Sequence, residues 1–332
     1  MQEPLRVRSA ELKGANVCNQ CEKLFDSTDS LRRSDFCSFR CEHLWAEEHG
    51  DCAIKVRGRY PRIGYIDGEV FTFPGNIPAV LERVRNYPID LFTFLQHPAR
   101  TGVLYKYPVE LDNLAVLSIS TFEHWWTKQA RYSVRKQVKK AERAGIDLSE
   151  EPLSDELLEA ITNIYNEVPT RQERKFRYYG VTLARVRELT CTFERRSIYI
   201  TARLNGSIIG FIKLITQDDY ATVLHILSLV AHRDKSPTNA LLAHSVKVCA
   251  ERNISQLSYG HFTYGKKDND GIQVFKTTNG FERLDVPRYF APQTTRGHIA
   301  LKLGLHHRLR EHVPEPMAAA FRSFRARWYK AV

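Results

Sequence analysis

The chain has 332 residues, of which 43% are hydrophobic and 26% are charged, a composition typical of a globular protein. It has no run of about 18 apolar residues and no apolar signal core at its start, so we expect a cytoplasmic protein with no membrane span. The net charge is +11, with 49 Lys and Arg against 38 Asp and Glu. This excess favours polyanionic partners, including RNA and phosphate-bearing substrates.

Four of the seven cysteines cluster near the N-terminus. They form two close pairs with fifteen residues between them, Cys18 with Cys21 and Cys37 with Cys41. Two such pairs can surround one tetrahedral Zn²⁺ ion, whose binding then drives the folding of a segment too small for its own core. We therefore predict a zinc-binding module over residues 1–55, with these four cysteines as ligands. Three neighbours could replace one ligand: His43, His49 and Cys52.

The half of this module around Cys37, Phe36-Cys37-Ser38-x-x-Cys41, is similar to short zinc-ribbon and treble-clef modules. A site closed by four cysteines has no open position, so we expect it to be structural rather than catalytic. The sequence leaves open whether the module only stabilises the fold or also binds RNA or protein.

Residues 56–125 contain short aromatic runs, such as 69–73 and 91–95, that are typical of strands. We predict a divergent strand-rich segment that packs on, or extends, the unit that follows at 126–295. That unit begins with apolar side chains at helical spacing: Trp126, Ala130, Val134, Val138 and Ala141. The pattern predicts one helix with one buried stripe, ended by Gly145.

A basic stripe lies one residue further round the same predicted helix and includes Arg131, Arg135 and Lys139. We predict that these three residues bind a polyanion, and the alternative is a solvated basic face with no ligand. The last residues, 296–332, are predicted to form a basic helical tail.

Periodicity and turn chemistry predict three further elements. A helix is expected to start near Ser154 and to bury one apolar face. Asn205-Gly206 is a strong two-residue hairpin signal between predicted strands 197–204 and 208–216. Residues 220–230 have almost no polar break, which predicts a central strand.

The loop after that strand leads into a helix whose start is predicted to bind a phosphate. Ser236 is a favoured N-cap residue and Pro237 a favoured first helical residue. A helix N-terminus attracts anions through its free N–H groups and partial positive charge, and Arg233 and Lys235 add full charges. The predicted donor-binding residues are Arg233, Lys235, Ser236, Thr238 and Asn239.

The order strand, strand, loop, helix, strand, helix, ending in Gly280-Phe281-Glu282, resembles the GNAT N-acyltransferase fold. Three motifs are similar to its Fem peptidyltransferase-like branch: Arg131-x3-Arg135-Lys136-x2-Lys139, Ser236-Pro237 and Phe275-Lys276-x3-Gly280. The resemblance covers Lys128 to Pro292 and implies an α+β fold, with a mixed sheet flanked by helices. GNAT enzymes usually carry glycines where Ser236 and Thr238 stand, and this departure favours a Fem-like donor or a non-catalytic adaptor over acetyl-CoA binding.

The resemblance also implies that Lys276 lines the active site, where a lysine can stabilise an oxyanion or a donor phosphate. We expect Phe275 to pack inward and Lys276 to face the groove. His261 and Tyr264 follow a predicted strand at 254–260, and either could protonate the leaving group. Each catalytic candidate has an ordinary alternative, as a surface lysine or a loop aromatic residue.

The leading interpretation is an N-acyltransferase that moves an acyl group from acyl-CoA to an amine acceptor. One alternative is a Fem-like enzyme with aminoacyl-tRNA as donor, which suits the basic stripe and the zinc module. The other is a non-catalytic, zinc-containing adaptor for nucleic acid or protein. The sequence does not identify the acceptor.

Overall fold

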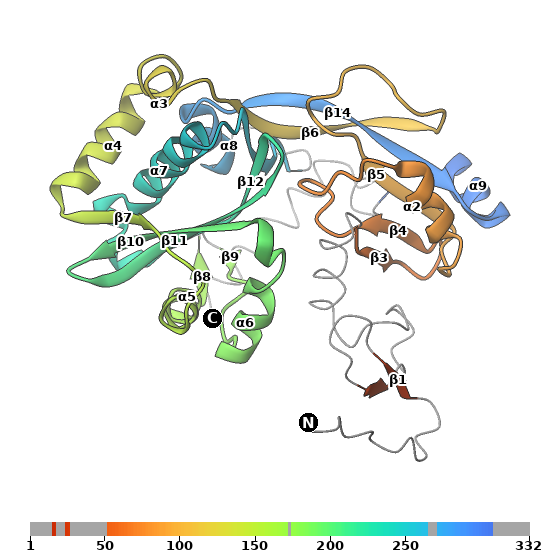
Figure 1. The fold of residues 1–332 in the computed structure, drawn as a ribbon, viewed down its shortest axis with the longest axis horizontal. Helices are drawn as coiled ribbons and strands as arrows, with labels where there is room; N and C mark the ends of the chain where they lie inside the picture. Colours follow the sequence, from red (N-terminus) through yellow and green to blue (C-terminus); the bar gives the residue numbers. More distant parts are fainter. Residues whose placement is uncertain (1–14, 18–23, 27–51, 172–173, 265–270, 308–332) are drawn as a thin grey trace, which may run out of the picture.

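The computed structural model describes residues 15–17, 24–26, 52–171, 174–264 and 271–307 (Figure 1). Near the N-terminus, β1 (Ala15–Val17) pairs antiparallel with β2 (Leu24–Asp26). The four predicted zinc ligands, Cys18, Cys21, Cys37 and Cys41, lie outside the described residues, so the zinc module stays a prediction. The predicted basic tail is described only as far as residue 307.

The fold is built on one ten-stranded sheet with the order β3-β4-β5-β14-β6-β13-β12-β11-β10-β7. The strands are β3 (Ile54–Arg57), β4 (Ile63–Ile66), β5 (Leu91–Leu95), β6 (Val109–Ser118), β7 (Ile146–Glu150), β10 (Ser197–Leu204), β11 (Ser207–Gln217), β12 (Tyr220–Ser228), β13 (Gln256–His261) and β14 (Glu282–Pro292). The pairs β12/β13 and β4/β5 are parallel, and the other neighbours are antiparallel. The sheet is therefore mixed, as predicted. A separate two-stranded ladder joins β8 (Thr170–Arg171) to β9 (Arg174–Lys175).

Helices cover both faces of the sheet (Figure 1). They are α2 (Ile77–Val84), α3 (Phe122–His124), α4 (Tyr132–Arg143), α5 (Asp155–Asn166), α6 (Leu183–Thr190), α7 (Pro237–Glu251), α8 (Gly271–Thr278) and α9 (Thr295–Lys302). Apolar residues of α4 and α7 share one core cluster with β10, β11 and β12, whereas α5 and α6 share another with β10 and β11. None of the helices in the described part of the chain has the length and apolarity needed to cross a membrane.

The hairpin and central-strand predictions are confirmed. Asn205 and Gly206 have φ angles of 51° and 81° and join β10 to β11, the conformation that Asn-Gly favours in a two-residue turn. β12 lies between β11 and β13, well inside the sheet. Ser154 caps α5 by accepting a hydrogen bond from the N–H of Leu157 at 3.2 Å.

The prediction of one helix from Trp126 to Gly145 is wrong at its start. Residues Trp125–Gln129 form a π-helical turn, the backbone becomes extended at Ala130 and Arg131, and α4 starts at Tyr132. The break is tied to the buried Trp125, whose indole N–H donates to the Asn279 carbonyl at 2.9 Å. From Val134 onward the predicted buried stripe is confirmed.

The strands β6 and β14 connect the two halves of the sheet. β6 pairs with β13 on one side and with β14 on the other, and β14 pairs in turn with β5. The sheet therefore runs without interruption across the predicted boundary at residue 125. The strand-rich segment extends the same sheet. Its last strand, β6, lies directly beside β13.

Candidate active site

The parallel strands β12 and β13 pair only at their beginnings. Their register covers Tyr220–Thr222 and Gln256–Ser258, and both strands then continue unpaired with each other, to Ser228 and His261. Unpaired strand ends leave backbone N–H and C=O groups free to bind an extended ligand. The predicted donor and catalytic residues follow these two strand ends.

A bulge in β13 sets the direction of His261. Ser258 pairs with Val116 of β6 and His261 with Leu114, so Tyr259 and Gly260 together face one residue of β6. Gly260 has φ +58°, and a Cβ at this position would lie 2.7 Å from the Tyr264 hydroxyl. Bulges often re-aim side chains beside active sites. This one turns His261 toward the carboxylate of Asp112 on β6.

His261 and Asp112 form a hydrogen-bonded pair. Nδ1 of His261 lies 3.1 Å from Oδ1 of Asp112 and 3.1 Å from the carbonyl oxygen of Asn113. Both neighbours are acceptors, so Nδ1 carries the proton and Nε2 of the neutral ring is left as a base. Nε2 makes no hydrogen bond within the described residues, and the side chain is 32% exposed.

Asp112 is itself held by Arg288 of β14. Nε and Nη2 of Arg288 donate to Oδ2 of Asp112 at 3.0 and 2.8 Å, while Nη1 and Nη2 bind both oxygens of Glu69 at 2.7 and 3.0 Å. The arrangement is a chain of alternating charges from Glu69 through Arg288 and Asp112 to His261. Such a chain fixes the ring orientation of His261.

The surroundings of this pair shift the pKa values of both His261 and Asp112. The hydrogen bond that His261 donates to Asp112 raises the pKa of His261 above its ordinary value, although burial and the charge of Arg288 oppose the rise. Burial alone would raise the pKa of Asp112, but the hydrogen bond with His261 and the charge of Arg288 outweigh it and lower that pKa strongly. Asp112 is therefore ionised at neutral pH and stabilises the imidazolium form of His261.

The structure brings the three predicted catalytic residues together. Nζ of Lys276, on α8, donates to the carbonyl oxygen of His261 at 2.6 Å and lies 4.8 Å and 4.7 Å from the ring centres of Tyr259 and Tyr264. The ring of Tyr264 meets His261 edge-on at 5.8 Å, and Tyr264 is 47% exposed. Tyr264 therefore reaches solvent beside the ring of His261.

The orientation expected for Lys276 is wrong. Its side chain is fully buried, whereas Phe275 is only partly buried. The ammonium group is held between two aromatic faces, an attraction that strengthens when the charge is shielded from water. Lys276 thus anchors the backbone of His261 from behind and does not line an open groove.

The start of α7 differs from the prediction in its cap. Ser236 is at the N-cap position but has a left-handed backbone, with φ 62° and ψ 40°, and its hydroxyl donates to Gln137 of α4 instead of capping the helix. Thr238 Oγ1 lies 3.2 Å from Ser228 Oγ at the end of β12. The left-handed backbone explains why glycine would suit position 236, and here a serine adopts it.

The charged residues of the donor loop lie in the 3₁₀ turn Val230–Lys235. Arg233 is exposed, and Lys235 forms an ion pair with Asp234 at 3.4 Å. Asn239 is half-buried one turn into the helix. The five predicted donor-binding residues therefore share one end of α7, where the first backbone N–H groups begin.

The sequence analysis missed two acidic residues, Asp112 and Glu69, and the arginine that binds both, Arg288. Asp112 and Arg288 come from different strands, and Glu69 precedes a loop. Another carboxylate, that of Glu167, accepts hydrogen bonds from the N–H groups of Val230 and Ala231 at 2.6 and 2.8 Å. Asp112 lies in the polar first half of β6, where Glu110 and Asp112 alternate with Val109 and Leu111 as on a solvated strand face, so no sequence pattern marks it as a site residue.

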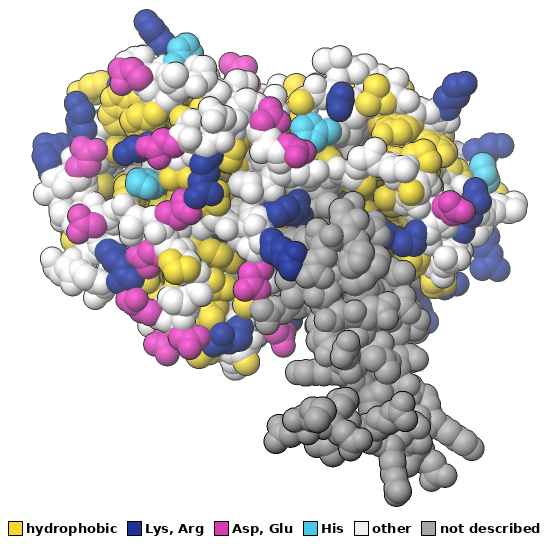
Figure 2. All heavy atoms as spheres, viewed as in Figure 1, with side chains coloured by type: hydrophobic (Ala, Val, Ile, Leu, Met, Phe, Trp, Pro, Cys, Tyr) yellow, Lys and Arg dark blue, Asp and Glu magenta, His cyan; other side chains and the backbone are white. Residues whose placement is uncertain are grey.

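The predicted polyanion-binding residues are arranged unequally on α4. Arg131 and Lys139 are exposed, whereas Arg135 donates to the carbonyl oxygens of Trp126 and Ala130 at 3.0 and 2.5 Å. Figure 2 shows Lys and Arg side chains along the edge of the molecule where α4 lies in Figure 1. Arg135 thus supports the break before α4, and polyanion binding by this face stays a prediction.

A cavity of about 550 Å³ lies away from these residues. Its lining includes His97 and the turn residues Asp218 and Asp219, which precede β12. The cavity therefore opens near the start of β12, whereas the His261 pair lies beyond the paired region of β13. The candidate active site is the group of residues around His261, none of which lines this cavity.

Comparison with known proteins is consistent with this geometry. Residues 128–276 match the family model described as an acetyltransferase (GNAT) domain. These residues are similar to a GNAT acetyltransferase domain. The domain spans α4 to Lys276 and includes the unpaired ends of β12 and β13. It supports the predicted acyltransferase activity of the GNAT type.

Solved structures share the fold at low sequence identity. The crystal structure of FemX is 10% identical, with a TM-score of 0.54, and the match covers 75% of this chain and 85% of FemX. L-PGS from Bacillus licheniformis is 15% identical, with a TM-score of 0.51 and coverage of 73% and 81%. A search of curated proteins with the sequence finds no match. These likenesses confirm the predicted similarity to Fem-like structures at the level of fold.

Proposed function

We propose that this protein transfers an acyl group from acyl-CoA to an amine acceptor, with His261 as the general base. The observation that carries the proposal is the hydrogen-bonded pair of His261 and Asp112 beside the unpaired ends of β12 and β13. Such a pair has little use in an adaptor, because a buried carboxylate and imidazole add little stability over an apolar pair. The pair therefore favours an enzyme over an adaptor.

The donor supplies a thioester, which an amine can attack at the carbonyl carbon with departure of the thiolate. In the proposed reaction Nε2 of His261 accepts a proton from the acceptor's amine as the C–N bond forms. Asp112 stabilises the resulting imidazolium through Nδ1. The hydroxyl of the half-exposed Tyr264 gives a proton to the leaving sulfur as the C–S bond breaks, and solvent then reprotonates the phenol.

The start of α7 fits the phosphates of such a donor in part. Arg233 is exposed and Lys235 lies beside it, so both can meet a negatively charged group. The carboxylate of Glu167 already occupies the N–H groups of Val230 and Ala231. We therefore propose phosphate contacts from Arg233 and Lys235 and from the first turn of α7, and none from residues 230–231.

Aminoacyl-tRNA is the second candidate donor, and a specific contact favours it. The Ser236 hydroxyl bonds to Gln137, which joins α4 to the start of α7. Arg131 and Lys139 are exposed on the same helix as Gln137, and we propose that they extend the phosphate site into a longer basic surface. A polynucleotide donor would use such a surface, whereas the compact phosphates of CoA would not reach along it.

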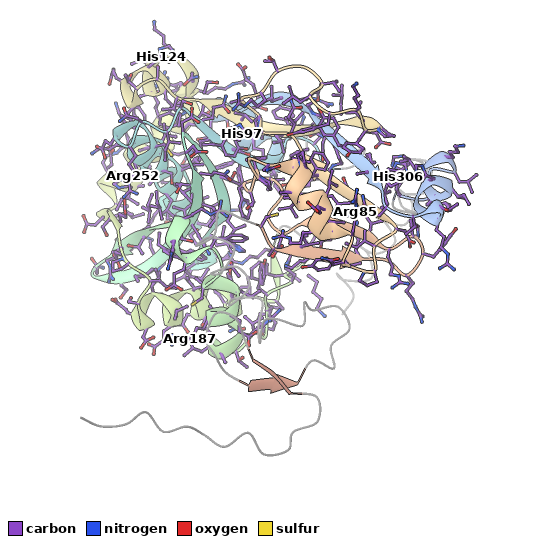
Figure 3. The ribbon with its side chains drawn as sticks, turned by 45° about the vertical axis from the view of Figure 1, so that its right-hand side comes forward. Arg85, His97, His124, Arg187, Arg252 and His306 are labelled. Atoms are coloured by element: carbon purple, nitrogen blue, oxygen red, sulfur yellow. The ribbon has the colours of Figure 1, made fainter. Side chains whose placement is uncertain are left out.

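The decisive experiment measures thiol release from acetyl-CoA and longer acyl-CoAs in the presence of polyamines, free amino acids and peptide amines. We expect amine-dependent release with the wild-type chain and a loss of about 10²- to 10⁴-fold in His261→Ala. His124→Ala, an exposed histidine on α3 (Figure 3), is the matched control and should keep full activity. If no acyl-CoA releases its thiol but aminoacyl-tRNA supports transfer, aminoacyl-tRNA would replace acyl-CoA as the proposed donor.

A further inference from the structure

A second cluster of potential ligands lies beyond α9, outside the candidate active site. α9 ends with Leu303 as C-cap and Gly304 in a left-handed conformation, at φ +67°. The N–H of Leu305 bonds to the carbonyl of Ala300 at 2.8 Å, and that of Gly304 to Leu301 at 3.1 Å. These bonds form a Schellman turn, which reverses the chain at Gly304.

The reversed chain delivers two consecutive histidines to the start of β6. Nε2 of His306 lies 2.9 Å from Oε1 of Glu110, and Nε2 of His307 lies 3.2 Å from the same oxygen. The three ligand atoms all lie within 4.8 Å of one another. Figure 3 labels His306 beside α9, where it packs edge-on against Phe290 at 4.6 Å.

The position of His306 is fixed more firmly than a surface ion pair requires. Its side chain is only 4% exposed, and its ring centre lies 4.0 Å from that of His307. Two neutral imidazole nitrogens that direct lone pairs at one carboxylate oxygen would repel it. The arrangement is favourable only if protons or a metal cation lie between these atoms.

We propose that Glu110, His306 and His307 bind a divalent transition-metal ion, with Zn²⁺ as the best match. Zinc bonds to nitrogen and carboxylate oxygen of about 2.0–2.2 Å place tetrahedral ligands roughly 3.3 Å apart, close to the separations of 2.9 and 3.2 Å. Two histidines and one carboxylate leave a fourth position for water. The ligand set contains no thiolate, which distinguishes it from the predicted cysteine site.

The ion would join two segments that are distant in sequence. His306 and Glu110 are separated by 196 positions, and α9 otherwise meets the sheet through β14 and β5. Binding would therefore secure the chain that follows α9 to the first residues of β6. The proposal is independent of the donor and acceptor of the acyl-transfer reaction.

Metal titration of the full chain after dialysis against a chelator tests the proposal. Zn²⁺ binding is measured by calorimetry, and Co²⁺ is used as a spectroscopic substitute, for the wild type, Glu110→Gln, His307→Ala and His298→Ala. His298 is an exposed histidine on α9 and serves as the matched control. Any metal bound by cysteines is common to all four proteins, so differences between them report the new site alone.

We expect Glu110→Gln and His307→Ala to bind one equivalent less than the wild type and His298→Ala. The lost Co²⁺ equivalent should show visible d–d bands without the near-ultraviolet thiolate charge transfer of a cysteine site. Glu110→Gln keeps side-chain size at a 42% exposed position, so it decides the question if His307→Ala unfolds. Equal stoichiometry and affinity in the wild type and Glu110→Gln would overturn the proposal.

Discussion

Replacing Asp112 with asparagine is the sharpest test of the proposed base. The change removes the charge that stabilises the imidazolium of His261 and leaves the size of the side chain unchanged. An amide can also present its NH₂ group to Nδ1, which would move the ring proton to Nε2 and block the base. The Asn113 carbonyl, 3.1 Å from Nδ1, opposes that change because it still accepts the Nδ1 proton.

We expect the rate of transfer to fall by about 10²- to 10⁴-fold in Asp112→Asn. The stability cost should be smaller than the about 3–5 kcal/mol of a buried charge left unpaired, because Arg288 keeps both bonds to Glu69. Losing one charged hydrogen-bonding partner costs about 1.5–3 kcal/mol. Rates are measured by thiol release and stability by urea unfolding, with the exposed Asp285→Asn as control.

The pH dependence supplies the second half of this test. His261 acts as a base when deprotonated, and its pKa is raised, so kcat/KM should increase with pH through that raised value. Loss of the Asp112 charge should move this rise to lower pH. The raised pKa also means that His261 adds stability below its unfolded pKa, which is lost as pH increases through the folded value. An unchanged profile and near-wild-type rate in Asp112→Asn would refute the assignment.

Three further substitutions test the anchoring role of Lys276, the backbone strain at Gly260 and donor binding by Arg233. Lys276→Ala should lower stability by about 2–5 kcal/mol in urea unfolding, because it empties a fully buried site, and unchanged stability would contradict the anchoring role. Gly260→Ala should cost about 1–2 kcal/mol from its positive φ and displace Tyr264, so intact transfer by this variant would argue against the bulge as a positioning device. Arg233→Ala should raise KM for acyl-CoA and leave the melting temperature unchanged, since the side chain is exposed, and an unaltered KM would move the phosphate site elsewhere.

Local signals explain the predictions that are confirmed. The Asn205-Gly206 turn depends on two adjacent residues that accept positive φ, and the start of α5 on one serine hydroxyl. The break before α4 depends on a contact between Trp125 and the Asn279 carbonyl, which lies 154 positions away. Helical periodicity cannot reveal such a contact, so the pattern extended the helix too far.

The candidate site was predicted only in part, because the sequence shows local order but not contacts between distant strands. Lys276, His261 and Tyr264 belong to one stretch of chain, and their proximity follows from the order of a strand and a helix. Asp112 and Arg288 meet His261 only because β6 and β14 pair in one register beside β13. The depth at which Lys276 lies is likewise a tertiary property, since a lysine in a short helix is usually exposed.

The residues that hold the His261 ring indicate how much of the chain the functional unit includes. The matched acetyltransferase domain ends at residue 276 and begins after β6, so it contains His261 but neither Asp112 nor Arg288. β6 supplies the carboxylate, β14 supplies the guanidinium, and Glu69 from the strand-rich segment balances its charge. The matched residues alone would leave the edge of β13 without its neighbour and Nδ1 of His261 without its acidic partner. The strands outside the matched domain are therefore part of the catalytic unit that we propose.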